Sequence, residues 1–173
     1  MSDQASKPSL IILGGLPATG KSSIAQELAR QIAAVLLRID TMEQAMRMSE
    51  PAIDPVDHGY RVGYALAEEN LSLGHAVIAD CVNPLTSTRK AWRDVAIRSG
   101  ANYIEVEVTC TDQAEHRRRV ETRVTDIEGL KLPTWQAVSE REYDPWDPHL
   151  VIDTSHFSVE QSVAAIRAAV ERR

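Results

Sequence analysis

The chain has 173 residues, of which 43% are hydrophobic and 25% charged, and its formal net charge at pH 7 is -6. This length suits a single domain with a full hydrophobic core. The acidic balance argues against nucleic acid as a partner, because such binding depends on many Lys and Arg contacts to phosphate, and no apolar run approaches the roughly 20 residues that a membrane-spanning helix needs.

Residues 1–8 are polar and have no apolar stretch behind basic residues, so we expect a flexible tail and no signal peptide. Residues 9–173 are expected to form one domain, because no linker or repeat interrupts them. Cys81 and Cys110 lack the spacing of a zinc site and are typical of reduced thiols. These features predict a cytoplasmic protein and leave its oligomeric state open.

Five short runs rich in Val, Ile and Leu have the length of strands and are followed by polar or turn residues. They cover residues 9–15, 34–40, 75–81, 103–110 and 149–155. Apolar residues recur at helical spacing between and after these runs: Ile24, Leu28 and Ile32; Tyr60, Tyr64, Ala67 and Leu71; Trp92, Val95 and Ala96 before Gly100; and Val159, Val163, Ile166 and Val170 after a Ser158–Gln161 capping box. This alternation predicts an α/β domain whose parallel sheet is covered by helices on both faces.

The first predicted strand leads into "GLPATGKSS", residues 15–23, which matches G-x-x-x-x-G-K-[ST]. Glycines let such a loop wrap closely, so that backbone N–H groups and the N-terminus of the next helix point at a phosphate. Lys21 can then reach the β- and γ-phosphates of ATP, and Ser22 can be a Mg²⁺ ligand. A chance match would lack the flanking strand and helix patterns, and both are present. The predicted nucleotide-binding residues are Gly15, Pro17, Ala18, Thr19, Gly20, Lys21, Ser22 and Ser23.

Two aspartates, Asp40 and Asp80, stand at the ends of predicted strands. Ligands of open α/β sheets bind beyond the carboxyl ends of the strands. Asp80 follows small or apolar residues, as a Walker B aspartate does, and is a candidate to hold Mg²⁺ together with Ser22. Asp40 would face the acceptor and take the proton of its hydroxyl. Each aspartate could instead cap a helix, and which of the two is the general base stays open.

Two arginines near these strand ends have open roles. Arg89 lies on the helix that we expect to start at Asn83 and Pro84, where it either contacts the acceptor or is a solvated charge. Arg38 interrupts an apolar run, and it either points to the acceptor pocket or pairs with a carboxylate on the sheet. The residue pattern alone supports both alternatives in each case.

The stretch "HRRRVETR", residues 116–123, gathers four arginines in an acidic chain. On a helix, Arg119 and Arg123 are four residues apart and share one face, whereas Arg117 and Arg118 project to other sides. Arginines can neutralise the charge of a transferring phosphoryl group. We therefore predict that Arg119 and Arg123 act on ATP phosphate, with plain solvated charge as the alternative.

A long segment follows this stretch before the last predicted strand. Asp112 and Glu115 fit the start of a helix, and the proline-bearing segment beyond it suits a mobile cover over a site. The predicted lid spans about residues 117–147. Its aromatic residues, which either pack against adenine or simply close the cover, are Trp135, Tyr143 and Trp146.

The segments "GLPATGKSS", "RID", "VIADCVNPLTSTR", "HRRRVETR" and "REYDPWDPHLVIDT" together resemble the small P-loop kinases of the nucleoside-monophosphate-kinase-like group. The similarity is to ATP-dependent kinases related to adenylylsulfate kinase, gluconate kinase and zeta toxins. It implies a three-layer α/β/α P-loop NTPase domain with five parallel strands in the order 2-3-1-4-5, ATP with Mg²⁺ as donor, and Arg119 and Arg123 as lid arginines. "VNPLTSTR" is similar to a substrate-contacting segment, which implies acceptor contacts by Asn83 and Arg89. "RIDTMEQAM" and Asp80 differ from the adenylylsulfate kinase pattern, so the resemblance does not identify the acceptor.

The leading hypothesis is a kinase that moves the γ-phosphoryl group of ATP to a hydroxyl of a small molecule. A GTP-dependent switch would need D-x-x-G after the third strand, where "DCVN" stands instead. The alternatives are a regulatory ATP-binding protein without an acceptor and a kinase of nucleic-acid 5′-hydroxyl ends. The acidic chain argues against the second of these.

Overall fold

The computed structural model describes residues 7–52 and 56–172. Most of the predicted tail, residues 1–6, lies outside this part of the chain. The Pro8 carbonyl accepts a hydrogen bond of 2.9 Å from the Asn102 N–H, so the described chain is joined to the sheet from its second residue. Among the described residues, no helix combines the length and the apolar character needed to cross a membrane.

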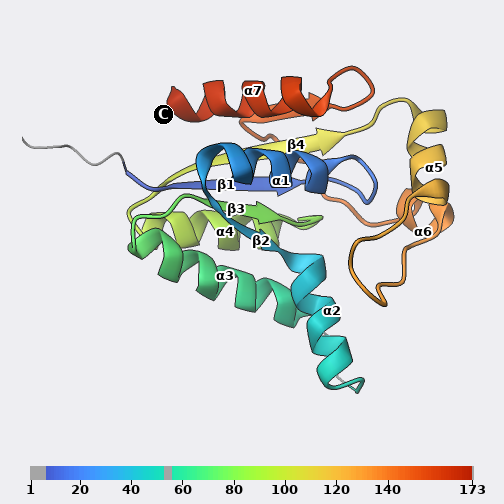
Figure 1. Cartoon of the computed structure of the whole chain (residues 1–173), viewed down its shortest axis with the longest axis horizontal. Helices are drawn as coiled ribbons and strands as arrows, with labels where there is room; N and C mark the ends of the chain where they lie inside the picture. Colours follow the sequence, from blue (N-terminus) through green and yellow to red (C-terminus); the bar gives the residue numbers. More distant parts are fainter. Residues whose placement is uncertain (1–6, 53–55, 173) are drawn as a thin grey trace, which may run out of the picture.

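The sheet has five parallel strands in the order β2-β3-β1-β4-β5, which confirms the order that the resemblance implied. The strands are β1 (Ser9–Gly14), β2 (Val35–Arg38), β3 (Val77–Asp80), β4 (Asn102–Thr109) and β5 (Leu150–Asp153). In Figure 1 the strand arrows point toward the side of the molecule where α5 and α6 lie. At this carboxyl end, Asp80 is in register with Leu13 of β1 on one side and Arg38 of β2 on the other.

The core lies on both faces of the sheet because strand side chains alternate between them. On β1, Leu10 and Ile12 belong to one buried cluster, whereas Ile11 and Leu13 belong to the other. The first cluster includes residues of α3 (Val56–Ser72) and α4 (Thr86–Arg98); the second includes residues of α1 (Lys21–Ile32) and α7 (Val159–Glu171). The predicted helices therefore form, and they cover the sheet on both faces.

Two predicted helix boundaries are confirmed by backbone and side-chain contacts. Gly100 has a φ of 63°, and its N–H donates to the Ile97 carbonyl after α4. Ser158 and Gln161 form the reciprocal capping box at the start of α7. A residue in the left-handed region, usually glycine, commonly ends a helix, and a capping box satisfies the unpaired N–H groups at a helix start.

The helix α2 (Ile39–Ser49) was not predicted from the sequence. The run at 34–40 was expected to be a strand ending in Asp40, but β2 ends at Arg38 and Asp40 lies in the first turn of α2. The change of direction has no Gly, Pro or Asn to mark it. Instead, buried Ile39 packs against Gly63 of α3. A Cβ added at Gly63 would lie 2.7 Å from the Cδ1 atom of Ile39. Tertiary packing thus sets this boundary.

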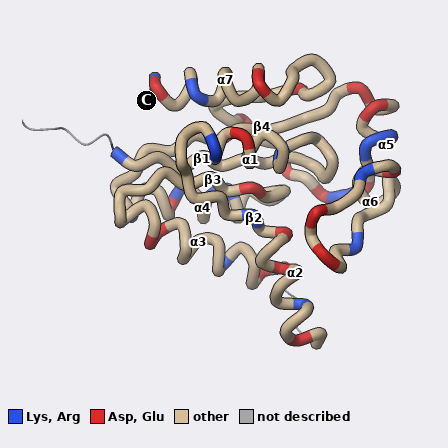
Figure 2. The backbone as a smooth tube through the Cα atoms, viewed as in Figure 1, with Lys and Arg blue, Asp and Glu red and all other residues tan. Residues whose placement is uncertain are grey.

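The predicted lid contains two helices, α5 (Gln113–Thr122) and α6 (Trp135–Ser139), joined by the loop 123–134. The Asp112 side chain accepts a hydrogen bond of 3.0 Å from the Glu115 N–H and caps α5, as expected. The helix ends at Thr122, so Arg123 is its C-cap residue rather than a residue of its interior. Figure 2 shows Lys and Arg along α5, beyond the carboxyl end of the sheet.

Candidate functional site

The loop between β1 and α1 wraps tightly on itself. Gly15 has a φ of 144°, and a Cβ there would lie 2.1 Å from the Val108 carbonyl oxygen. Gly20, with a φ of 99°, precedes α1 in a backbone region that favours glycine. The Gly15 N–H donates to the Val82 carbonyl at 3.0 Å, which holds the loop against the segment after β3. The strand, loop and helix therefore have the arrangement that anion binding at a helix N-terminus requires.

Lys21 lies inside this loop and is only 7% exposed. Its Nζ donates to the Leu16 carbonyl at 2.8 Å. Burial lowers the pKa of Lys21, whereas the nearby carboxylates Asp80 and Asp40 raise it. An ammonium group held at this position can contact a phosphate that the loop binds.

Asp80 ends β3 and is 4% exposed. Burial raises the pKa of Asp80, and Lys21 and a hydrogen bond from Ser22 lower it. Its Oδ2 atom is buried without a hydrogen-bond partner among the described residues, and the Arg38 Nε atom lies 3.7 Å from it. This carboxylate therefore has an unused oxygen beside the Ser22 hydroxyl.

Ser22 and Asp80 fit a Mg²⁺ ion, which prefers oxygen ligands and usually takes only one or two carboxylates from the protein. The described residues contain no group of three or more His, Cys, Asp or Glu side chains that could form an all-protein metal site. A magnesium ion held here would complete its shell with phosphate oxygens and water. The unused Asp80 Oδ2 atom is the feature that such an ion would satisfy.

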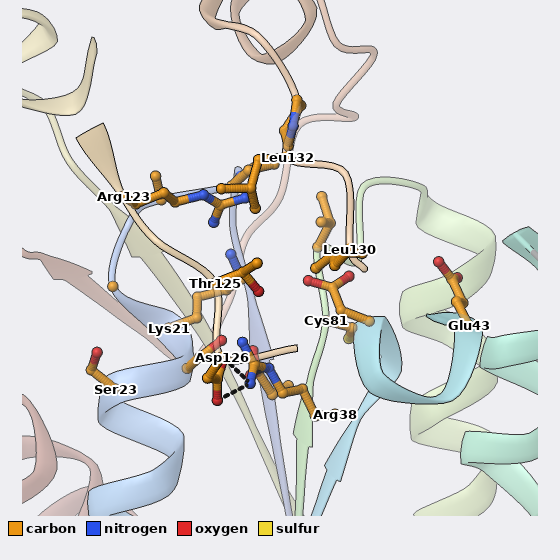
Figure 3. A pocket seen from close by; sticks show the side chains of 18 of the residues that line it. Lys21, Ser23, Arg38, Glu43, Cys81, Arg123, Thr125, Asp126, Leu130 and Leu132 are labelled. Atoms are coloured by element: carbon orange, nitrogen blue, oxygen red, sulfur yellow. Dashed lines mark hydrogen bonds and ion pairs between the residues drawn. The ribbon is translucent and has the colours of Figure 1, made fainter. Parts of the chain in front are cut away.

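A cavity of about 660 Å³ opens above the loop, between α2 and the lid. Figure 3 shows Arg38, Lys21 and Cys81 at its base, with Arg123, Leu130 and Leu132 around it. The lining residues come from the phosphate loop and α1 (Pro17, Ala18, Gly20, Lys21, Ser22, Ser23, Gln26), from β2 and α2 (Arg38, Asp40, Glu43, Arg47), from the end of β3 (Asp80, Cys81, Val82) and from the lid (Arg119, Arg123, Val124, Thr125, Asp126, Leu130, Lys131, Leu132, Pro133, Arg141). The cavity thus joins segments that are far apart in the sequence.

Asp40 and Arg123 reach this cavity from opposite walls. Asp40 comes from the first turn of α2, and Arg123 comes from the end of α5. Burial lowers the pKa of Arg123, whereas Asp40 raises it. The Arg123 Nε atom is buried and has no hydrogen-bond partner among the described residues. A carboxylate and a cation with unused bonding capacity therefore face the same space.

Arg119 is held firmly between the lid and the phosphate loop. Its Nε donates to Glu115 at 2.8 Å, and its Nη1 donates to the Thr154 Oγ1 atom at 2.8 Å. The Thr154 hydroxyl in turn lies 2.7 Å from the Thr19 carbonyl oxygen of the loop. Arg117 and Arg118, whose side chains are 60% and 63% exposed, are solvated as predicted. Helical spacing therefore separated the four arginines correctly by exposure.

Two residues that join the lid to the phosphate loop were missed. One is Thr154, after β5, and the other is His116, whose Nε2 lies 2.8 Å from the Pro17 carbonyl oxygen. The His116 ring is buried and packs edge-to-face against Trp135 at a centroid distance of 5.3 Å. The position of His116 on the same helix face as Arg119 was a usable signal for His116, whereas nothing in the sequence marked Thr154.

Arg38 was expected either to point to the acceptor pocket or to pair with a carboxylate on the sheet. It lines the cavity, and it pairs with two carboxylates from different elements. Its Nη1 donates to both carboxylate oxygens of Asp126 in the lid loop, each at 2.8 Å, as drawn in Figure 3. Gln44 of α2 also donates to the Glu128 carbonyl at 3.2 Å. These two contacts hold the lid loop against the end of β2 and the side of α2.

Comparison with known families decides the classification. A family model described as AAA domain matches residues 10–141, which include the phosphate loop, α2 and most of the lid. The chain belongs to the AAA domain family. Its fold is that of the P-loop kinases, which confirms the resemblance seen in the sequence motifs.

Relatives and solved structures extend this AAA domain match to nearly the whole chain. The adenylyl-sulfate kinase of Geotalea uraniireducens (strain Rf4) is 27% identical over 174 residues, which cover 96% of this chain and 82% of the relative. The Mycobacterium tuberculosis APS kinase CysC, in complex with AMPPNP and APS, has a TM-score of 0.75 at 19% identity, over 96% of this chain and 99% of that one. A gluconokinase from Sinorhizobium meliloti 1021 has a TM-score of 0.66 at 21% identity, over 96% of this chain and 94% of the gluconokinase chain. These structural likenesses show the shared fold.

Arg89 of this AAA domain is placed differently from both alternatives considered from the sequence. It is 2% exposed, so it is not a solvated charge, and it does not line the cavity. Its guanidinium donates to four backbone carbonyls at 2.9–3.0 Å, those of Asn83, Pro84, Asp144 and Pro145. The Tyr143 and Trp146 rings lie 4.9 and 4.6 Å from its Cζ atom. With its donors used in this way, Arg89 holds the end of the lid onto the start of α4.

Asn83 also lies outside the cavity lining, although it was expected to contact the acceptor. It does not start a helix, because α4 begins at Thr86 and Asn83 has a φ of 53°. Its side chain is fully buried, and its backbone N–H donates to the Tyr60 hydroxyl at 2.8 Å. The three aromatic residues considered for adenine, Trp135, Tyr143 and Trp146, pack against His116 or Arg89 and are likewise absent from the lining.

Proposed function

We propose that this protein is an ATP-dependent phosphotransferase that moves the γ-phosphoryl group to a hydroxyl of a small molecule. One observation carries the proposal: a single cavity of about 660 Å³ is lined by the phosphate loop, by Asp40 and Asp80, and by Arg119 and Arg123 from the lid. This set combines a phosphate cradle, a proton acceptor and positive charge, which are the parts that phosphoryl transfer requires. The family match and the kinase activity named for its relatives support the same reaction class.

The phosphate loop would bind the donor. Its backbone is shaped by Gly15 and Gly20, and the N-terminus of α1 supplies N–H groups and a positive dipole end. Lys21 lies within the loop and would exchange its bond to the Leu16 carbonyl for a phosphate oxygen. The M. tuberculosis APS kinase of similar fold was solved with AMPPNP, an observation that supports an adenine nucleotide as donor.

Ser22 and Asp80 would hold Mg²⁺, which would supply positive charge against the negative charge of the phosphates. The near-complete burial of Asp80 and its contact with Arg38 leave it little access to an acceptor hydroxyl. Asp40 is more exposed than Asp80 and lines the cavity from the α2 wall. We therefore assign the general base to Asp40 and the metal ligand to Asp80.

In the proposed reaction, an Asp40 oxygen accepts the proton of the acceptor hydroxyl while the hydroxyl oxygen bonds to the γ-phosphorus. The bond from that phosphorus to the β-γ bridging oxygen breaks, and ADP leaves. Lys21, Arg119 and Arg123 stabilise the negative charge on the transferring group and the leaving oxygen. The lid loop, held by Arg38 and Gln44, would exclude water that could otherwise attack in place of the acceptor.

A screen of ATP consumption tests this proposal. Purified protein with ATP and Mg²⁺ is offered sugars, sugar acids, nucleosides, hydroxylated antibiotics and adenylylsulfate, and ADP release is measured with and without each compound. We expect at least one hydroxyl compound to raise ADP release at least about tenfold above the acceptor-free rate, because an acceptor completes the cavity. Tight ATP binding with a turnover that no acceptor changes would contradict the proposal and favour a regulatory ATP-binding protein.

A further inference from the structure

A second cavity of about 450 Å³ adjoins the first, between α2 and the lid loop. Arg47, Leu130 and Lys131 line both cavities, so the two cavities are neighbours that share part of their walls. The remaining lining residues of the second cavity are Gln44, Met48 and Gly129. The phosphate loop contributes nothing to this cavity. Of its lining residues, the proposed function uses Gln44 alone, as a contact that holds the lid loop.

One face of α2 runs from the first cavity into the second. Asp40, Gln44, Arg47 and Met48 follow one another at spacings of four, three and one residues, which keeps them on one side of the helix. Arg47 lies seven positions after Asp40, which corresponds to roughly 10 Å along a helix that rises 1.5 Å per residue. The wall therefore presents a carboxylate near the phosphate loop and a cation about two turns farther out.

The charges in the second cavity have one sign. Arg47 and Lys131 are the charged residues in its lining, and both are cations in a chain whose net charge is -6. The Arg47 Nη2 atom lies 3.7 Å from Glu43, too far for a strong hydrogen bond. Lys131 is exposed and makes no ion pair with another described residue. Two cations with unused donors are thus held beside the apolar side chains of Met48 and Leu130.

We propose, building on the proposed function, that Arg47 and Lys131 bind an anionic group of the acceptor in this second cavity. The acceptor is then an elongated small molecule with a hydroxyl at one end, beside Asp40, and a carboxylate, phosphate or sulfate at the other. Charge-assisted hydrogen bonds from Arg and Lys are the usual means of holding such groups. The carbon skeleton between the two ends would pack on Met48 and Leu130. A neutral sugar or nucleoside would leave both cations without a partner.

Lysine footprinting tests the anion site without requiring turnover. The protein is saturated with ADP and Mg²⁺, so that the phosphate loop is filled, and is then acetylated in the presence of pyrophosphate, ribose 5-phosphate, D-gluconate or neutral D-ribose. We expect at least one anion to slow acetylation of Lys131 several-fold, whereas D-ribose does not. Lys90, an exposed lysine paired with Asp94 on α4, serves as the internal control. Equal labelling of Lys131 with every anion and with none would overturn the proposal.

Paired variants test the same site further. Arg47→Gln and Lys131→Gln should each weaken the protecting anion about tenfold, since each removes one hydrogen bond to a charged group. Arg117→Gln and Lys90→Gln remove comparable exposed charges outside both cavities and should change nothing. For an active acceptor, the first pair should raise its KM and leave the KM for ATP unchanged. Unaltered protection and KM in Arg47→Gln and Lys131→Gln would overturn the anion site, whereas protection of Lys131 without phosphoryl transfer to any compound would overturn the kinase proposal instead.

Discussion

Two regions face the first cavity but are built in different ways: the phosphate loop, and a wall formed by α2 and the lid loop 123–134. The loop positions its groups through the backbone: Thr19 and Lys21 are nearly buried, and Gly15 lies too close to the Val108 carbonyl for any side chain. The wall positions its groups through side chains on a helix and a loop, and Asp126, one of its main contacts, is 62% exposed. In the proposed kinase, donor binding would therefore be set by backbone shape, whereas acceptor choice would depend on side chains that can be exchanged without changing the fold.

The largest effect should follow from removing charge within the loop. Lys21→Ala should lower phosphoryl transfer by about 10³- to 10⁵-fold, because a cation that neutralises the transferring group is worth that much in comparable enzymes. ADP release in the presence of an active acceptor is the measurement. Arg117→Ala, which removes an exposed cation paired with Glu121, should retain the wild-type rate. Retained transfer in Lys21→Ala would remove the loop from the mechanism.

Asp40→Asn should distinguish the role of the α2 wall in phosphoryl transfer from the role of the phosphate loop in ATP binding. A general base contributes about 10² to 10⁴ in rate, so transfer should fall by this factor while the affinity for ATP stays close to that of the wild type. Binding is measured by isothermal titration calorimetry and transfer by ADP release. An Asp40→Asn protein that transfers phosphate normally would make Asp40 a structural residue of α2 and leave Asp80 as the candidate base.

The sequence predicted the phosphate loop well and the wall formed by α2 and the lid loop less well. The phosphate loop, the strands and the caps at Asp112 and Ser158 depend on local patterns and were predictable from them. The order of the strands was implied by the family resemblance. The start of α2 was not, because Arg38 and Ile39 carry no turn signal and the chain changes direction only through packing against α3. The Arg38–Asp126 pair spans 88 residues in the sequence, so no local pattern could reveal it.

Arg89 shows the same limit for a single charged residue. Its position on a helix was predictable, but its burial depends on four carbonyls and two aromatic rings, several of them from a segment more than 50 residues away. The residue type alone does not indicate whether an arginine is exposed or buried. Only the tertiary structure distinguishes a substrate contact from a residue that anchors the lid.

Arg89→Met tests this anchoring role. Removing the guanidinium leaves buried carbonyls without donors, so we expect the free energy of unfolding to fall by about 3 kcal/mol. Urea denaturation followed by circular dichroism measures the loss. Lys90→Met, at the neighbouring exposed position, should stay within about 0.5 kcal/mol of the wild type. Equal stability of the two variants would show that the contacts of Arg89 with the lid contribute little.

The smallest effect concerns the contact between the two regions. Asp126→Asn weakens the bridge from the lid loop to Arg38, and an exposed ion pair is worth about 0.2 to 1 kcal/mol. We expect acceptor-independent ATP hydrolysis to rise up to about fivefold, because the lid would exclude water less well. Asp94→Asn breaks a similar exposed pair with Lys90, far from the cavity, and is the matched control. Identical hydrolysis rates in both variants would contradict a role for this bridge in closure.

In the proposed reaction, the phosphoryl group leaves ATP for a hydroxyl compound rather than for water. The most direct test follows the reaction of the wild-type protein, ATP, Mg²⁺ and an active acceptor by ³¹P nuclear magnetic resonance. We predict a new phosphate-ester signal that grows in a 1:1 ratio with ADP, and its loss in Asp40→Asn. Formation of ADP with an equal amount of inorganic phosphate, and no ester with any acceptor, would contradict the account.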